Sequence, residues 1–271
     1  MRDSQLNAVV TLKTEISPWL MILRIVPDGW QLPAFRPGQF AVLGLPGSAP
    51  RCALAEPEVP PADPQQLIRR AYSIASSSLI NEYLEFYIAL VTSGALTPRL
   101  FALEIGDRLW LSARVSGIFT LDQVPEDQNV IMIATGTGLA PYMSMLTTHL
   151  MCGSARRFAV LHGARHSWDL GYRSELMTLQ HLCPNLSYHP VISRPEHEPV
   201  PWPGAIGHVQ DLWQQDIVAR SWGFRPTPDN THIFLCGSPA MIESLIPMLA
   251  QAGFQEHTKQ NPGQVHVERY W

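Results

Sequence analysis

The pattern of hydrophobic residues changes near residue 125, and this change constrains the fold more than any other feature. Before it, short apolar and β-branched runs separated by Gly and Pro predict strands. After it, short apolar runs alternate with longer amphipathic ones, which predicts a parallel sheet covered by helices on both faces. We therefore predict two domains, residues 1–125 and 126–271, and the length of 271 residues also favours two domains.

The first domain is predicted to contain six strands, enough for an antiparallel barrel or sandwich. These strands are residues 8–16, 19–26, 39–45, 70–75, 84–91 and 108–113, with one short helix at residues 97–103. The second domain is predicted to have strands at residues 130–134, 158–162, 186–192 and 231–235, and helices from residue 141 and around residues 174–182, 209–217 and 240–252. Residues 46–66, rich in Pro, Ala and Glu, read as a surface loop that need not be ordered.

Charge and cysteine content exclude several classes of protein. The net charge of −4, from 19 basic and 23 acidic residues, argues against a nucleic-acid-binding face. Four widely spaced cysteines without a C-x-x-C pair argue against a zinc knuckle or an iron–sulfur cluster, and predict reduced, mostly buried thiols. The N-terminus lacks the apolar stretch of a signal peptide, so we expect a cytoplasmic protein without a membrane partner.

Other catalytic classes are also disfavoured by the sequence. No G-x-S-x-G turn is present for a serine hydrolase. The ten histidines are scattered, and the one close pair, His162 and His166, straddles Gly163 at the end of a predicted strand, so we expect no metal site. The uncharged residues 128–155 are interrupted by Gly and Pro, which favours a buried strand, turn and helix over a membrane span.

A glycine-rich turn, Thr135-Gly136-Thr137-Gly138-Leu139-Ala140-Pro141, follows a predicted strand and opens a helix. Such a turn lets the backbone approach a pyrophosphate at a helix N-terminus. A tight strand-to-helix turn made for structural reasons alone would look similar, so the turn by itself leaves both interpretations open.

Further motifs occur in a distinctive order along the chain. Arg70-Ala71-Tyr72-Ser73 lies on a predicted strand, where Arg70 can bind phosphate and Tyr72 offers a flat ring face. Gly94-Ala95-Leu96-Thr97 opens the short helix, and Cys236-Gly237-Ser238-Pro239 follows the last predicted strand of the second domain. Together with the glycine-rich turn, this order resembles the ferredoxin–NADP reductase superfamily over nearly the whole chain. The ending Val267-Glu268-Arg269-Tyr270-Trp271 resembles its bacterial ferredoxin/flavodoxin reductases, which finish in an aromatic residue.

The resemblance implies an FAD-binding barrel, an NADP-binding α/β domain, and hydride transfer between the two cofactors. It implies catalytic roles around the flavin and nicotinamide for Ser73, Cys236, Glu268 and Trp271. It implies FAD contacts from Arg70, Ala71, Tyr72, Ser73, Ile88, Ala89, Leu90, Ala95, Leu96, Thr97, Thr137 and Trp271. Gly136 and Gly138 are expected to admit the pyrophosphate of NADP(H), and Tyr72 and Trp271 to cover opposite faces of the flavin.

Coenzyme preference depends on positive charge near the ribose 2′-phosphate. Arg165 and Arg194 match two arginine positions that the resemblance implies, whereas His208 stands where a third arginine is typical. A histidine is mostly neutral at pH 7 and replaces that charge only in part. We therefore expect NADPH to be preferred, by a smaller margin than three arginines would give.

The electron partner implied by the resemblance is ferredoxin, flavodoxin or both, served by a monomeric enzyme. An alternative is an electron-transfer subunit or reductase of a larger redox system on the same scaffold. An acidic partner needs a basic patch, for which Arg69, Arg99, Arg108 and Arg114 are candidates.

Overall fold

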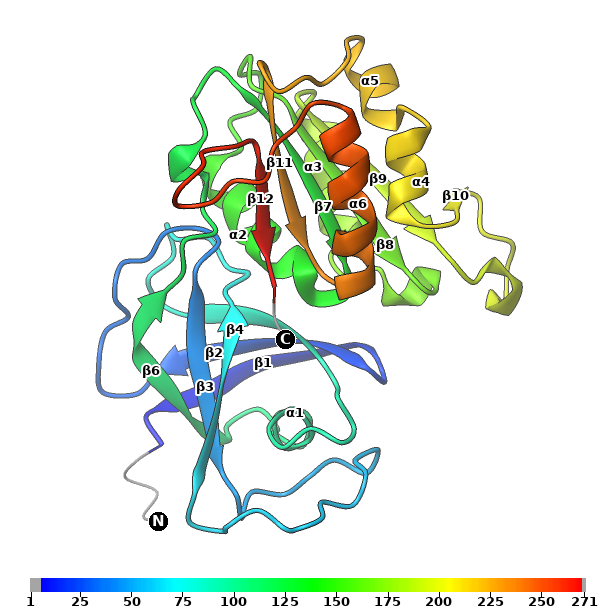
Figure 1. The fold of residues 1–271 in the computed structure, drawn as a ribbon. Coiled ribbons are helices and arrows are strands. Elements are labelled where there is room, and N and C mark those ends of the chain that lie inside the picture. The colour runs from blue at the N-terminus through cyan, green and yellow to red at the C-terminus, as the bar shows by residue number, and fades with distance from the viewer. Residues whose placement is uncertain (1–5, 270–271) are drawn as a thin grey trace. The chain divides into compact units, whose positions relative to one another are not determined.

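The computed structural model describes residues 6–269, and these residues form two compact units (Figure 1). The first unit comprises the chain up to Thr120 together with residues 140–148, and the second comprises residues 121–139 and the chain from His149 onward. Tyr270 and Trp271, for which the sequence made predictions, lie outside the described residues.

The first unit is a six-stranded antiparallel barrel, as the sequence predicts. Its strands are β1 (Ala8–Ser17), β2 (Leu20–Pro27), β3 (Phe40–Pro46), β4 (Leu67–Ser73), β5 (Leu84–Ala89) and β6 (Arg108–Ser116), and its short helix is α1 (Thr97–Phe101). The strand order is β4-β3-β6-β1-β2-β5, and a bridge between Ile74 and Phe86 joins the two outer strands. Inward-facing side chains such as Leu23, Leu43 and Leu109 are fully buried and fill the barrel.

The first nine residues of helix α2 (Ala140–His149) belong to the same unit. The hydroxyl of the buried Ser144 donates to the carbonyl oxygen of Ser76 over 2.7 Å, and the hydroxyls of Ser77 and Thr148 lie 3.0 Å apart. The segment that follows β4 is therefore anchored to this helix by hydrogen bonds.

The second unit is built on a parallel sheet. Its strands are β7 (Asn129–Thr135), β8 (Phe158–Ala164), β9 (Leu186–Ile192), β10 (Ala205–Ile206), β11 (Thr231–Cys236) and β12 (Val265–Glu268), in the order β10-β9-β8-β7-β11-β12. The helices are α3 (Arg173–Leu182), α4 (Val209–Gln214), α5 (Ile217–Trp222) and α6 (Pro239–Gln251). Buried residues of α4, α5 and α6 pack with Ile131, Leu161 and Leu235 on one face of the sheet, and α3 contacts β9.

The structure corrects two details of the predicted second domain. The single helix expected over residues 209–217 is interrupted at Asp216, whose φ of 51° ends α4 and starts α5 in a new direction. The edge strands β10 and β12 have no counterpart in the prediction, because two and four residues are too short for a periodic pattern to emerge.

The proline-rich segment of residues 46–66 is fixed to the barrel. Glu58 accepts hydrogen bonds from Arg99, at 2.9 Å and 3.1 Å, and lies 3.3 Å from Nη1 of Arg51. Arg99 also donates to the carbonyl oxygens of Gly47 and Ala95. The segment is thus a surface loop between β3 and β4, as predicted, and these contacts fix its position on the barrel.

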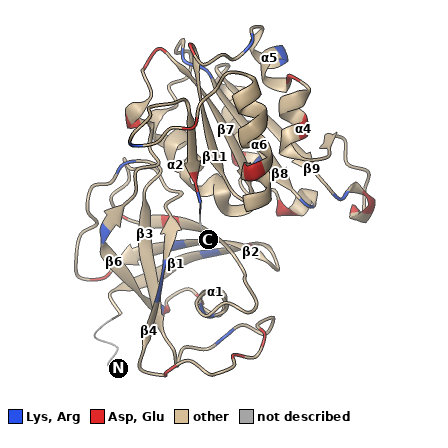
Figure 2. Cartoon of the chain, in the orientation of Figure 1, with Lys and Arg blue, Asp and Glu red and all other residues tan. Residues whose placement is uncertain are grey.

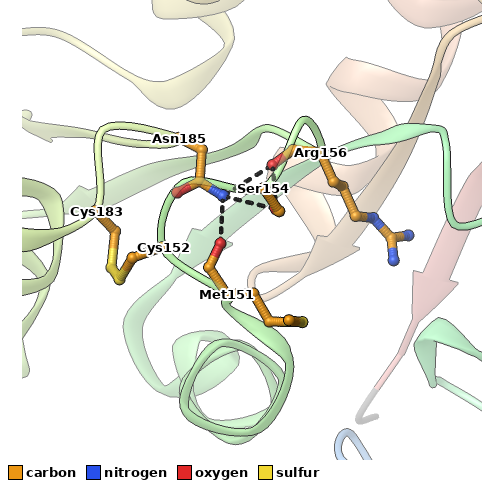
Figure 3. The surroundings of a disulfide bond; sticks show 6 residues. All are labelled: Met151, Cys152, Ser154, Arg156, Cys183 and Asn185. Atoms are coloured by element: carbon orange, nitrogen blue, oxygen red, sulfur yellow. Dashed lines mark hydrogen bonds between the residues drawn. A yellow bond between two sulfur atoms is a disulfide. The ribbon is translucent and has the colours of Figure 1, made fainter.

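Figure 3 shows a disulfide between Cys152 and Cys183, which corrects the prediction of four reduced thiols. The turn after α2 brings Cys152 to the end of α3, although 31 residues separate the two cysteines. Asn185 holds the same turn, because its Nδ2 donates to Met151 O, Ser154 Oγ and Arg156 O at 2.9–3.1 Å. The sequence does not reveal this proximity, which depends on the parallel pairing of β8 with β9, because that pairing brings the turns before the two strands together.

Charged residues of both signs are dispersed over both units (Figure 2), in keeping with the small net charge. Across residues 6–269, none of the helices has the length and apolar character required to cross a bilayer.

Candidate functional site

The strand order of the second unit creates a place where ligands commonly bind. The chain runs outward from β7 through β8 to β9 on one side, and continues on the other side with β11 and β12. In open parallel sheets, nucleotides bind beyond the carboxyl ends of the strands where the order reverses. Here that point lies between β7 and β11, and the predicted glycine-rich turn occupies it as a short 3-10 helix, Gly136–Leu139.

The turns that follow β7 and β11 touch through their backbones. A Cβ atom on Gly138 would overlap the carbonyl oxygen of Cys236, and one on Gly237 would overlap Thr135. The hydroxyl of Thr135 accepts a hydrogen bond of 2.8 Å from the amide of Ser238. Gly138 is therefore required for packing against β11, a cause distinct from the predicted admission of pyrophosphate. Gly136, with φ of 55° and no atom within 4 Å of a Cβ, leaves open space beside the turn.

Cys236 and Glu268 come together at the end of the sheet. The parallel register pairs Cys236 with Glu268 on β12 and with Ala134 on β7. Cys236 is a fully buried cysteine, and Glu268 is half-buried. Two of the predicted catalytic residues are thus neighbours, 32 positions apart in sequence, whereas Trp271 lies outside the described residues.

Arg165 and Arg194 follow β8 and β9 in adjacent turns. The amide of Arg194 donates to the carbonyl oxygen of Arg165 over 2.9 Å, and the amide of Ser193 donates to Ala164 O over 3.0 Å. Both arginines are exposed, and no carboxylate within residues 6–269 forms an ion pair with either. Two guanidiniums are therefore available to an anion at this edge of the sheet.

His208 lies at the same edge, as the residue that precedes α4. Its amide donates to the carboxylate of Asp211 over 2.7 Å, and the amide of Gly207 donates to Ile192 O at the end of β9. Asp211 puts a negative charge next to the position where the resemblance implies a third arginine. This carboxylate opposes binding of a phosphate there.

Side-chain contacts that sequence reasoning missed hold the two arginine turns together. Ser167 donates to Glu198 through its amide at 2.7 Å and its hydroxyl at 2.6 Å. His166 Nε2 lies 3.2 Å from Nδ1 of His197, and its Nδ1 lies 3.0 Å from Oδ2 of Asp169. The only signal in the sequence is a high density of polar residues in both turns, which does not identify the pairs.

In the first unit, Arg70 and Tyr72 lie on the same face of β4. Continuing the antiparallel register of the Ile74–Phe86 bridge places Tyr72 across from Ile88 on β5. Arg70 is exposed, and within the described chain its guanidinium donates to the carbonyl oxygen of its neighbour Arg69. The hydroxyl of Tyr72 is buried with no partner among the described residues, and burial raises its pKa above the usual value of 10.0.

The remaining predicted flavin contacts surround this seam between β4 and β5. Ser73 is buried and pairs with Phe40 on β3, and the amide of Leu90 donates to Trp19 O over 2.8 Å. Ala71 is exposed, Ile88 is buried and Ala89 is half-buried.

The loop that enters α1 offers backbone donors. The amides of Ala95 and Leu96 have no acceptor among the described residues. The hydroxyl of Thr97 closes the loop instead, because it bonds both the amide and the carbonyl oxygen of Val91 at 3.0 Å and 3.1 Å.

The expected basic patch is smaller than the sequence indicated. Arg99 is only 3% exposed and pairs with Glu58, and Arg108 forms an ion pair with Asp28. Arg99 therefore cannot contact an external partner, and this part of the prediction is wrong. Arg69 and Arg114 are exposed, and Arg69 also lies over the ring of Trp110.

Three histidines are part of the protein core. Burial lowers the pKa of His162 to about 3, of His232 to about 4 and of His266 to about 3. His162 Nδ1 lies 3.1 Å from the hydroxyl of Tyr188, and His232 Nδ1 lies 2.9 Å from Nε2 of His266. These side chains are neutral at pH 7, and the described residues contain no group of three or more potential ligands for a metal ion.

Comparisons with known proteins agree with this geometry. The model of the oxidoreductase NAD-binding domain matches residues 132–245. The flavodoxin/ferredoxin–NADP reductase of Escherichia coli K12 is 30% identical over 240 residues, which cover 88% of each chain. The reductase component of phenol 2-monooxygenase from Pseudomonas sp. CF600 is 30% identical over 267 residues, 98% of this chain and 65% of that protein.

A solved structure extends the similarity to the fold of the whole chain. The ferredoxin NADP+ reductase of Neisseria gonorrhoeae, solved with bound FAD and NADP, superimposes with a TM-score of 0.80 at 20% identity, over 98% of this chain and 99% of that one. Barrel, parallel sheet and motif order thus agree with the sequence relationship to the bacterial reductases. The chain belongs to the ferredoxin–NADP reductase family.

Proposed function

We propose that the protein is an FAD-dependent reductase that transfers hydride between NADP(H) and FAD, and single electrons between FAD and ferredoxin or flavodoxin. The observation that carries the proposal is the convergence of Cys236, Glu268 and the glycine turn at the switch point of the parallel sheet. Membership of the reductase family supports the same chemistry.

The barrel has groups that suit FAD. Arg70 carries a guanidinium without a carboxylate partner in the described chain, and the amides of Ala95 and Leu96 lack acceptors there. We assign these groups to the pyrophosphate of FAD, because unpaired donors of this kind bind phosphate oxygens. Tyr72, with its unpartnered buried hydroxyl, is assigned to the flavin ring, and Ile88, Ala89 and Leu90 to its apolar edge.

Bound FAD supplies the ability to accept two electrons as hydride and release them one at a time. The contribution of the protein is to orient the two rings and exclude water. We assign Cys236, which is fully buried, and Glu268 to the nicotinamide, and Ser73, which is buried on β4, to the flavin nitrogen that receives hydride. Thr137 and Trp271 are assigned to the flavin edge and face, and Gly136 to the pyrophosphate of the coenzyme.

NADPH is the proposed coenzyme, with a moderate preference over NADH. Arg165 and Arg194 are joined through their backbones and remain exposed, so both can reach the 2′-phosphate. His208 supplies less charge than an arginine, and the carboxylate of Asp211 beside it opposes the phosphate. Because two of the three expected positive charges are present, we expect NADPH to be preferred over NADH by a smaller margin than a site with three arginines would give.

Ferredoxin or flavodoxin is the proposed partner, and Arg69 and Arg114 on the barrel are the exposed candidates for docking an acidic surface. The proposal is tested by NADPH-driven reduction of each purified partner, followed through cytochrome c. Arg69→Gln with Arg114→Gln should lower the rate at low salt and reduce its dependence on ionic strength. Arg220→Gln, an exposed arginine of α5, is the matched control. An unchanged salt dependence in the double variant would exclude this docking surface.

A second function is favoured by one comparison. The reductase component of phenol 2-monooxygenase aligns with 98% of this chain at 30% identity, although this chain spans only 65% of that protein. The alternative role is delivery of electrons to an oxygenase of a larger redox system. Rapid NADPH oxidation with neither ferredoxin nor flavodoxin reduced, and coupling to an oxygenase instead, would establish this second role. Cytoplasmic location and the monomeric state stay predictions.

A further inference from the structure

His166 and His197 form a hydrogen-bonded imidazole pair in the two turns that carry Arg165 and Arg194. His166 directly follows Arg165, and the amide of His197 donates to the carbonyl oxygen of Arg194 over 3.2 Å. The two ring planes are inclined by 25° with centroids 5.5 Å apart, and the ring of Trp168 stacks on His166 with centroids 4.5 Å apart. The pair is therefore built into the proposed coenzyme-binding edge.

The hydrogen bonds determine where each ring carries its proton. Asp169 Oδ2 lies 3.0 Å from Nδ1 of His166, and a carboxylate accepts, so His166 donates from Nδ1. The neutral His166 ring then has its lone pair on Nε2, which requires His197 to donate from Nδ1 across 3.2 Å. The remaining acceptor of the pair is Nε2 of His197.

This last nitrogen is accessible to a proton and close to a carboxylate. The side chain of His197 is 54% exposed, and its Nε2 lies 3.8 Å from Glu196 Oε1. The same two turns also carry the charged residues Asp169, Glu198, Arg165 and Arg194. Glu198 is occupied by Ser167, through both the amide and the hydroxyl, so it acts on the pair only as a nearby negative charge.

We propose that His197 is a specificity-determining residue whose Nε2 takes up a proton when the 2′-phosphate of NADPH binds between the two arginine turns. The phosphate dianion adds negative charge beside Arg165 and Arg194 and so favours the protonated ring. That ring supplies the third positive charge, which His208 and its neighbour Asp211 do not provide. NADH, which lacks this phosphate, binds without the extra proton.

The inference rests on the proposed function, since it requires NADPH to be the coenzyme. It predicts that selectivity for NADPH over NADH, as the ratio of kcat/KM values, rises as the pH falls from 8 to 6. An average uptake of about half a proton between pH 8 and pH 6 corresponds to about a tenfold change in this selectivity ratio, relative to a variant whose residue 197 cannot be protonated. His197→Gln is that variant, because a glutamine amide can still donate to His166 but cannot become charged.

The direct test is calorimetric binding of adenosine 2′-monophosphate to the holoenzyme at pH 7, in two buffers with different enthalpies of ionisation. The phosphate of the probe also exchanges protons, but it does so equally in every variant, so the difference between two variants reports only on the protein. The wild type should take up more protons than His197→Gln, and His181→Gln, an exposed histidine of α3, should match the wild type. Equal proton uptake in wild type and His197→Gln, or no binding of the probe, would overturn the inference.

A separate readout distinguishes failure of the proposed function from failure of the inference. If neither NADPH nor NADH reduces the flavin of the wild type, the proposed function is wrong. If NADPH reduces it rapidly but the pH dependence of selectivity is the same in wild type and His197→Gln, only the role of His197 is wrong.

Discussion

The amide of Arg194 donates to the carbonyl oxygen of Arg165 over 2.9 Å, so two turns from different strands carry their guanidiniums as one unit. Neither arginine has a carboxylate partner within residues 6–269. Backbone hydrogen bonds thus hold together the two turns that we propose as the coenzyme-binding edge, and leave their arginine side chains exposed.

Replacing Arg165 or Arg194 by Ala should therefore affect NADPH alone. A charge-assisted hydrogen bond contributes about 1.5–3 kcal/mol, so KM for NADPH should rise about 10–100-fold while KM for NADH stays unchanged. Steady-state kinetics with both coenzymes provides the measurement, and Arg220→Ala is the control. Equal losses with NADPH and NADH would show that these arginines do not contact the 2′-phosphate.

Gly138→Ala should destabilise the second unit, because the new Cβ would overlap the carbonyl oxygen of Cys236. Overpacking of this kind costs about 1–3 kcal/mol in the free energy of unfolding, measured with urea. Gly153→Ala, at φ of 83° with no atom within 4 Å of a Cβ, is a control for the cost of replacing glycine at a positive φ. An unfolding free energy of Gly138→Ala equal to that of the wild type would contradict the close approach of the turns after β7 and β11.

The pairing of Glu58 with Arg99 predicts a stability that depends on pH. Hydrogen bonds from Arg99 lower the pKa of Glu58 from 4.5 to about 2. Because the carboxylate is favoured in the folded state, its contribution is fully present above pH 4.5 and is lost as the pH falls toward 2. Glu58→Gln should lower the free energy of unfolding at pH 7, since it leaves the buried Arg99 without its counter-charge.

Urea unfolding at pH 7, 5, 4 and 3 tests the predicted direction of this pH dependence of stability. The difference between wild type and Glu58→Gln should shrink below pH 4.5. A difference that is constant over this range would mean that Glu58 is not held ionised by Arg99.

The disulfide and Asn185 hold the same turn and should contribute separately to stability. Closing a loop of 31 residues contributes about 3–4 kcal/mol in the chain-entropy account. Reduction should lower the Tm of the wild type and leave Cys152→Ser unaffected. Asn185→Ala should lower the Tm of both oxidised and reduced protein, because it removes three hydrogen bonds that do not depend on the sulfur atoms. No effect of reductant on the wild-type Tm would show that the disulfide is absent or does not stabilise the fold.

The sequence was sufficient to predict the barrel, the parallel sheet and the order of the motifs. Strands such as β1 and β2 have recurring apolar residues, and the turn at Gly136 follows a strand whose residues 130–134 are all apolar. Patterns of this kind depend on local residues and are visible in a single chain.

Contacts between distant residues could not be predicted in the same way. The pairing of Glu58 with Arg99, of Cys152 with Cys183 and of His166 with His197 depends on how separate loops fold together. Arg99 illustrates the consequence, because a charged residue in a short helix gives no sign in the sequence that it is buried. The pairing of Cys236 with Glu268 could not be predicted either, because it depends on β12, a strand of four residues that is too short to be recognised in the sequence.

The most direct test of the central claim is the visible absorption spectrum of the FAD-loaded protein before and after anaerobic addition of NADPH, and then of NADH. The account predicts flavin bands that bleach rapidly with NADPH and more slowly with NADH at equal concentration. A protein that does not bind FAD, or whose bound flavin is reduced by neither coenzyme, would contradict it.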